Sequence, residues 1–378
     1  AGTVRLAPIQ PPPATPPTTA TVSRGYARLA APPGFCQPRS AFALSPLMKS
    51  RPGTAALLLG AASLLTGCTT LKHTAVDTLG DALAAGGTTF SADDDPQLIA
   101  AAAPFSLKLM ESLLAERPQH RGLLLAAASG FTQYAFGFVQ QDADEVTEKD
   151  FAAGSVLKTR ARRLYLRARD YGLRGLDAAH PNFSSQLRAD PRKAVRLATK
   201  TDVPLLYWTA ASWGAAIAIS KDNADLIADQ GILEALIDRA HELDADHDHG
   251  AIHAFLVTYE MARPGGAGDA ATRSRRHFER AMALSAGQQA GPLVNLAEAV
   301  MIPQQNRAEF ESLLKRALAV DADARPEFRL VNLVMQRRAR WLLGRIDDLF
   351  LPAAEPTPAP PTAAAASRPA SGFHFSPT

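Results

Sequence analysis

The sequence predicts an all-α protein built from paired helices, and three observations support this fold class. Apolar side chains recur with a helical period from residue 73 to residue 350, and no stretch in this region convincingly alternates with the period of a strand. Prolines at 96, 191 and 292 stand near the first turn of predicted helices, where the missing N–H is tolerated. Asn306 and Glu309 have the spacing of a capping box.

The helices expected from these signals lie near 74–85, 96–117, 121–140, 156–179, 203–220, 230–243, 250–262, 269–285, 292–302, 307–320 and 326–347. The segment from Leu205 to Ile219 is apolar almost all round, so we expect it to be a central buried helix. It is too short to cross a membrane.

Three helix ends have a similar sequence and indicate an internal repeat. Their alanines are Ala240, Ala281 and Ala317, which stand 41 and 36 residues apart. This spacing is close to the 34-residue period of tetratricopeptide repeats, in which small residues let paired helices approach closely. We therefore expect a degenerate tetratricopeptide-like solenoid or bundle of helix pairs.

The two ends of the chain differ in composition from this helical region. Most of the 28 prolines lie in residues 1–47 and 352–378, and these segments contain few large apolar side chains. Such segments cannot bury enough surface to offset the entropy of ordering. We expect 1–47 and 351–378 to be disordered, and we interpret 1–47 as upstream sequence translated in frame, with Met48 as the initiator.

Residues 48–67 have the order of an export signal. Lys49 and Arg51 precede a short apolar stretch that ends at Leu65-Thr66-Gly67-Cys68. This ending resembles the bacterial lipobox, which implies cleavage before Cys68 and acylation of that cysteine. Since Thr69 and not aspartate follows, the resemblance favours a periplasmic, lipid-anchored protein on the inner leaflet of the outer membrane. Residues 68–350 then form the folded helical domain.

The composition excludes several classes of function. The formal net charge of +3 is nearly balanced, so we expect no nucleic-acid partner. The only cysteines are Cys36 and Cys68, which leaves no thiolate for chemistry in the helical region. No nucleophile elbow, phosphate loop, dinucleotide fingerprint or zinc-protease motif occurs. We expect no catalytic residues and no cofactor.

Three groups of side chains are candidates for a site. The aromatic residues Tyr134, Tyr207, Trp208 and Trp213 fit either core packing or an apolar ligand cleft between helix layers. His247, His249 and His253 with Asp248 could hold a metal, but a turn between helices accounts for them better, so we predict no metal site. The third group is a run of arginines on one helix, which favours a solvated or internally paired face over an anionic partner. Its members are Arg160, Arg162, Arg163, Arg167, Arg169 and Arg174.

Several segments in order resemble one family. They are Asp93 to Pro96, Ser129 to Ala135, Phe138 to Asp144, Arg162 to Leu173, Asp202 to Trp208 and Arg337 to Leu343. Together they resemble the T-component of tripartite ATP-independent periplasmic (TRAP) transporters, over residues 68–350. The resemblance implies a periplasmic lipoprotein of tetratricopeptide-like helix pairs that associates with the solute-binding protein of the transporter, and it implies no reaction.

The expected function is therefore a transporter accessory that docks the solute-binding protein and binds an apolar ligand, not an enzyme. The alternative is a general helical-repeat lipoprotein that serves as a scaffold for envelope assembly. Gene neighbourhood would separate the two. Repeat proteins with apolar end faces often self-associate, so a homo-oligomer is a further expectation.

Overall fold

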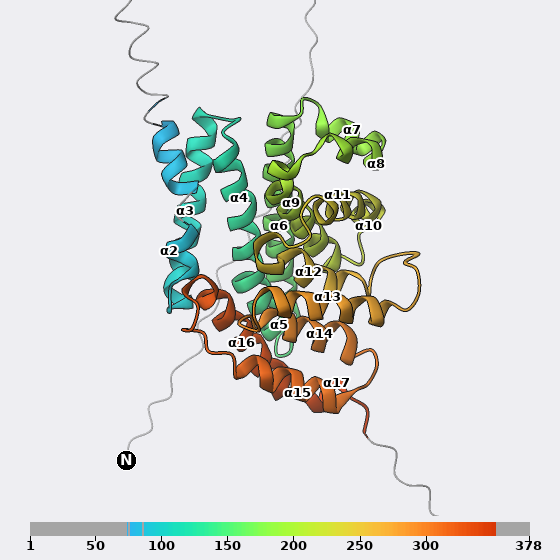
Figure 1. Ribbon diagram of the computed structural model, residues 1–378. Coiled ribbons are helices and arrows are strands. Elements are labelled where there is room, and N and C mark those ends of the chain that lie inside the picture. The colour runs from blue at the N-terminus through green and yellow to red at the C-terminus, as the bar shows by residue number, and fades with distance from the viewer. Residues whose placement is uncertain (1–73, 75, 85–86, 353–378) are drawn as a thin grey trace, which may run out of the picture. The chain divides into compact units, whose positions relative to one another are not determined.

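The computed structural model describes residues 74, 76–84 and 87–352, which all belong to the unit Gly60–Thr378 (Figure 1). These residues form helices and connecting turns, with no strand among them, so the predicted all-α class is confirmed. The predicted signal, Cys68 and both terminal segments lie outside the described residues. The division of the chain at 47, 67 and 350 stays a prediction.

The first helices begin where the capping signals predict. Residues 76–84 are helical and are followed by α2 (Gly87–Ser91) and α3 (Pro96–Glu116). The Asp95 carboxylate accepts hydrogen bonds from the backbone N–H groups of Gln97 and Leu98, which satisfies two donors at the start of α3. A short turn after α3 leads into α4 (Arg121–Tyr134), and the two helices pack against each other.

The helix that begins with α4 is longer than predicted. It passes through a π-helical segment, Ala135–Gln140, and continues as α5 (Gln141–Thr147), so the end expected at residue 140 is wrong. Two acidic residues of this extension are paired: Asp142 and Asp144 accept hydrogen bonds from arginines near the C-terminal end of the domain. Tertiary contacts thus extend the helix beyond its apolar pattern.

The core is built around α6 (Phe151–Ala179) and α9 (Val203–Ala218), which lie side by side, with α4 against both. As predicted, α9 is central: Leu206, Ala210 and Trp213 are fully buried. The two helices approach closely at Gly172, where a Cβ atom would overlap the Thr209 hydroxyl. A residue with any side chain would therefore push α6 away from α9.

Short helices that the apolar pattern does not reveal connect α6 to α9 and α9 to the next long helix. They are α7 (Phe183–Ala189), α8 (Pro191–Ala194), 3-10 turns at Val195–Leu197 and Lys200–Asp202, and α10 (Ala224–Ala228). Asp202 anchors this region from a buried position. Its carboxylate accepts hydrogen bonds from Arg121 and from the Thr199 backbone, and it contacts His180.

The second half of the domain continues as a series of helices that each pack on the next. The long ones are α11 (Gln230–Leu243), α12 (His247–Tyr259), α13 (Ala270–Leu284), α15 (Arg307–Leu318) and α16 (Arg329–Gly344). Between them lie α14 (Gly291–Leu296), a π-helical segment at Ala297–Met301, a 3-10 turn at Pro326–Phe328, and finally α17 (Ile346–Leu349). The backbone of α12 has positive φ from Asp248 to Gly250, so its regular part begins near the predicted position.

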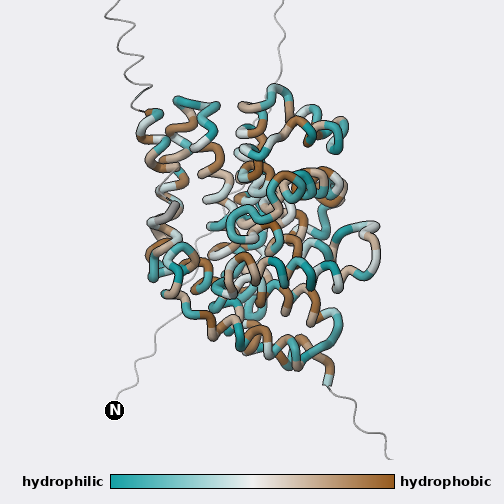
Figure 2. Tube along the Cα trace, viewed as in Figure 1, coloured by the Kyte–Doolittle hydropathy of each residue, from teal (hydrophilic) through white to brown (hydrophobic). Residues whose placement is uncertain are grey.

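The alanines that suggested a repeat are buried at corresponding places. Ala240, Ala281 and Ala317 stand near the ends of α11, α13 and α15 and are at most 1% exposed. Apolar and hydrophilic residues alternate along most of the helices in Figure 2, as expected for helices that each bury one face. The burial fits helix pairs, while the tetratricopeptide-like solenoid itself remains a prediction.

Two helical segments among the described residues, Pro96–Glu116 and Arg121–Thr147, have the length and apolar composition of a membrane span. This property is weak support for a membrane span, because a buried core helix shares it, and much of the second segment is buried in the domain.

Candidate functional site

The aromatic residues predicted to line a cleft divide into three environments. Tyr207 and Trp208, neighbours on α9, are half-buried, and their rings meet edge to face with centroids 4.9 Å apart. The His247 ring stands 6.0 Å from that of Tyr207. Burial, together with the nearby Asp248 carboxylate, raises the pKa of Tyr207, so its hydroxyl stays protonated. This pair keeps part of its surface accessible.

Trp213 and Tyr134 have other neighbours. Trp213 is fully buried, its indole N–H lies 3.2 Å from the Asp229 carboxylate, and the Arg169 guanidinium stands 4.8 Å from the ring centroid. Tyr134 is half-buried, and its hydroxyl accepts a hydrogen bond from Arg160 at 3.2 Å. The two helices that carry these residues, α4 and α9, do pack together. A role of the four residues in ligand binding stays a prediction.

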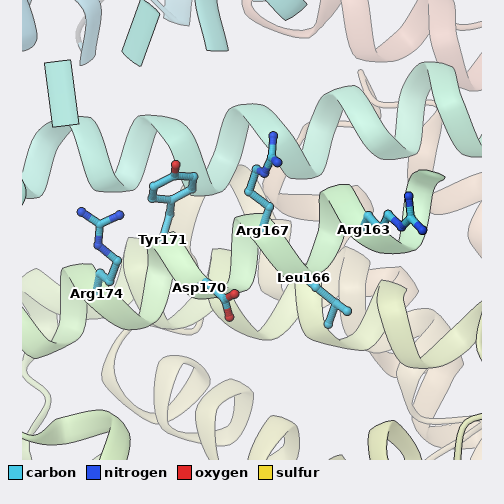
Figure 3. A pocket seen from close by; sticks show the side chains of 6 residues that line it. All are labelled: Arg163, Leu166, Arg167, Asp170, Tyr171 and Arg174. Atoms are coloured by element: carbon cyan, nitrogen blue, oxygen red, sulfur yellow. The ribbon is translucent and has the colours of Figure 1, made fainter. Parts of the chain in front are cut away.

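The basic run on α6 lines an open groove of about 360 Å³ on the domain surface (Figure 3). Three arginines and a tyrosine line it together with one aliphatic residue and one carboxylate: Arg163, Leu166, Arg167, Asp170, Tyr171 and Arg174. They occupy one side of α6, at successive turns of the helix (Figure 3). The groove therefore has a positive surface around an aromatic ring.

Two of these arginines contact other residues of the domain, in line with the solvated or internally paired face that the sequence predicts. Arg167 lies 3.6 Å from the Glu111 carboxylate, and Arg174 donates to the Pro118 carbonyl at 3.0 Å. The Tyr171 hydroxyl donates to Glu111 at 2.8 Å, and burial together with that carboxylate raises the pKa of Tyr171 to about 12. Arg163 is exposed, and no ion pair to another described residue is found for it. It is the groove cation best placed to meet an anionic group.

Two of the segments that carry the family resemblance meet in space. Arg337 Nη2 lies 2.8 Å from Asp142 Oδ1, and Arg338 Nη1 lies 3.1 Å from Asp144 Oδ2. Arg338 also donates to both oxygens of Glu298 at 2.6 and 2.7 Å. These contacts join α5 to α16, which are almost two hundred residues apart in sequence. They bridge two segments that are distant in the sequence.

The histidines considered as metal ligands do not form one group. His247 contacts Tyr207, while the ring of His249 meets that of Phe328 at 5.2 Å. His253 instead joins His241 and His277, and no motif spacing connects these three residues. His249 and His253 suggested a metal site because they are four residues apart. The three residues that do meet come instead from separate helices. Only the packing of those helices brings them together.

These features define an all-helical domain with a partly accessible aromatic pair and a basic groove. The chain matches the TRAP transporter T-component family over residues 92–350. It is also 32% identical over 266 residues to an uncharacterized protein of Treponema pallidum (strain Nichols). The aligned region covers 69% of this chain and 82% of the relative. The chain belongs to the TRAP transporter T-component family, and the resemblance drawn from the sequence is confirmed. Membership supports an accessory role in a TRAP transporter.

Proposed function

We propose that this protein docks the periplasmic solute-binding protein of a TRAP transporter and is not itself an enzyme. The observation that carries the proposal is the family match over 92–350, which spans nearly all of the described helices. Membership in an accessory family of a transporter accounts for a domain of packed helices without requiring any reaction. A protein of this kind acts by binding.

The groove on α6 is the surface proposed for docking. Its lining has three guanidinium groups and one carboxylate, so it favours an acidic partner surface. Arg163 is exposed, and the Tyr171 ring supplies an apolar face with a polar tip. Arginine and tyrosine are among the residue types that contribute most of the binding energy at protein interfaces. An apolar ligand is proposed to contact Tyr134, Tyr207 and Trp208, which are partly accessible, whereas Trp213 of the predicted set is fully buried.

The proposed location is the periplasm, with a lipid anchor at Cys68 in the inner leaflet of the outer membrane. The support is the sequence order of basic residues, short apolar stretch and lipobox before Cys68. Cys68→Ser should release the protein from membranes. Retention of the Cys68→Ser protein in the membrane fraction would refute this anchor. Self-association is proposed as well, and analytical ultracentrifugation would show it.

The docking proposal is tested by mixing the purified full chain with a purified TRAP solute-binding protein from the same organism and measuring binding by isothermal titration calorimetry. The proposal expects saturable binding, and an unrelated solute-binding protein from a different transporter class serves as the control. Absence of binding to the cognate protein, or equal binding to both proteins, would contradict docking. The general envelope scaffold would then become the better account.

A further inference from the structure

Three imidazole rings from three consecutive long helices meet inside the second half of the domain. His241 belongs to the last turn of α11, His253 to α12 and His277 to α13. The ring centroids are 5.1 Å apart for His241 and His253, 5.8 Å for His241 and His277, and 5.1 Å for His253 and His277. One nitrogen of each ring lies within 4.8 Å of the corresponding nitrogens of the others. The rings converge on a common point.

The hydrogen bonds of this cluster leave one ring nitrogen without a partner among the described residues. The Nδ1 atoms of His253 and His277 face each other at 2.8 Å, so a single proton between them satisfies both. Nε2 of His241 is buried and has no hydrogen-bond partner among the described residues. A buried nitrogen without a partner carries a desolvation penalty that a bound cation would remove.

The surroundings keep two of the rings, His253 and His277, in the form that binds metals. Burial, followed by the neighbouring His277, His241 and Arg280, lowers the pKa of His253 to about 4, against the opposing effect of Asp246. Burial also lowers the pKa of His277, which faces Arg263 and Arg273 as well as Glu260. His253 and His277 are therefore neutral at neutral pH, and a neutral imidazole is the ligand form.

We propose that His241, His253 and His277 form a binding site for a divalent transition-metal ion, of which Zn²⁺ is the best match. Three imidazole ligands suit zinc, copper and nickel, whereas calcium and magnesium prefer oxygen. Tetrahedral Zn–N bonds of about 2.0–2.1 Å place ligand nitrogens roughly 3.4 Å apart, so the His253 and His277 rings need to separate only slightly. Binding through both Nδ1 atoms would move the shared proton to Nε2 of the ring that carries it, so both rings stay neutral imidazoles, and it would leave the fourth position for water.

Such an ion would connect α11, α12 and α13, and this predicts a gain in stability. The full chain, purified without a polyhistidine tag and stripped with chelator, is titrated with Zn²⁺ alone. We expect one ion per chain by calorimetry and a melting temperature that rises with Zn²⁺ concentration. Substitution of Co²⁺ should give the visible absorption bands of a tetrahedral nitrogen site.

The matched variants are His241→Gln and His277→Gln, at half-buried positions on different helices, with His249→Asn as the control. His249 lies outside the cluster, and its positive φ is one that asparagine accepts. Each cluster variant should weaken Zn²⁺ binding beyond the roughly 10–100-fold that loss of an outer-shell partner costs, whereas the control should bind like the wild type. The proposal is overturned if the wild-type protein binds no stoichiometric Zn²⁺. It is equally overturned if binding survives in both cluster variants or is lost only in His249→Asn.

Discussion

Arg338 on α16 donates a hydrogen bond to Asp144 on α5, with Nη1 and Oδ2 3.1 Å apart, across 194 residues of sequence. The two side chains are only 13% and 17% exposed, so water screens this pair poorly. Burial alone would lower the pKa of Arg338, but Glu298 and Asp144 together raise it. The guanidinium therefore stays charged and fixes α5 against α16 within the domain.

Removing this guanidinium should destabilise the whole domain. Arg338→Ala leaves the Asp144 and Glu298 carboxylates without their main partner, and breaking a buried ion pair in this way costs about 3 kcal/mol of unfolding free energy. Urea unfolding followed by circular dichroism measures the loss. Lys315→Ala is the control, because Lys315 pairs with Glu311 on the exposed side of α15. A loss for Arg338→Ala no greater than that for Lys315→Ala would show that the pair does not hold the domain together.

Close contact between α6 and α9 gives a second prediction. Gly172→Ala places a methyl group on the Thr209 hydroxyl, and overpacking of this kind costs about 1–3 kcal/mol. Gly231→Ala in α11 meets no atom within 4 Å, so it should be neutral or stabilising by up to about 1 kcal/mol. Thermal unfolding compares the two variants. Thr209→Ala combined with Gly172→Ala should recover part of the loss, and a strictly additive double variant would argue against this contact.

The aromatic residues of α9 should respond differently to truncation. Trp213→Ala removes a fully buried side chain and its hydrogen bond to Asp229, and it should cost about 3–5 kcal/mol of stability. Trp208→Ala removes a half-buried ring, so we expect a smaller loss of stability and weaker binding of the partner or of an apolar ligand. Melting and affinity are measured on both variants. If Trp208→Ala lowers the melting temperature as much as Trp213→Ala and leaves affinity unchanged, Trp208 is only a packing residue.

The Asp202 carboxylate predicts how stability depends on pH. Burial opposes ionisation, but hydrogen bonds from the Thr199 backbone and from His180 lower the pKa of Asp202 below its ordinary 3.8. A carboxyl group with a lowered folded-state pKa stabilises the protein above its unfolded pKa, and this stabilisation is lost as the pH falls through the folded pKa. The unfolding free energy of the wild type should therefore decrease below about pH 4. Asp202→Asn should make this decrease smaller. Asp347→Asn, at an exposed carboxylate, should not. If the unfolding free energy of Asp202→Asn depends on pH as that of the wild type does, Asp202 is not the group responsible.

The sequence predicted the long helices because their cores and caps are local. Apolar periodicity and Asp95 determine where α3 begins, and the apolar run after Pro204 predicts the buried α9. The short α7 was missed, since seven residues give too little periodicity. The end at residue 140 was wrong because α5 is stabilised by contacts with α16, and a distant partner leaves no local signal.

The candidate sites were harder to predict from the sequence than the helices, because they depend on tertiary packing. Tyr207 and Trp208 are adjacent in sequence, so their contact could be anticipated, whereas Trp213 faces the core on the same helix. The run of arginines showed a basic face on α6, but which cations remain available depends on Glu111 and Pro118, more than forty residues earlier. His241, His253 and His277 follow no motif spacing.

Docking through the α6 groove is tested by measuring the dissociation constant of the cognate solute-binding protein for the wild-type chain and two variants side by side. We expect Arg163→Glu, in the α6 groove, to weaken binding relative to the wild type by about tenfold or more, equivalent to roughly 1.4 kcal/mol. Arg316→Glu, an equal charge change in a separate groove on α15, should leave the dissociation constant unchanged. The groove assignment fails if both variants bind as the wild type does, and the docking function itself fails if the wild-type protein does not bind.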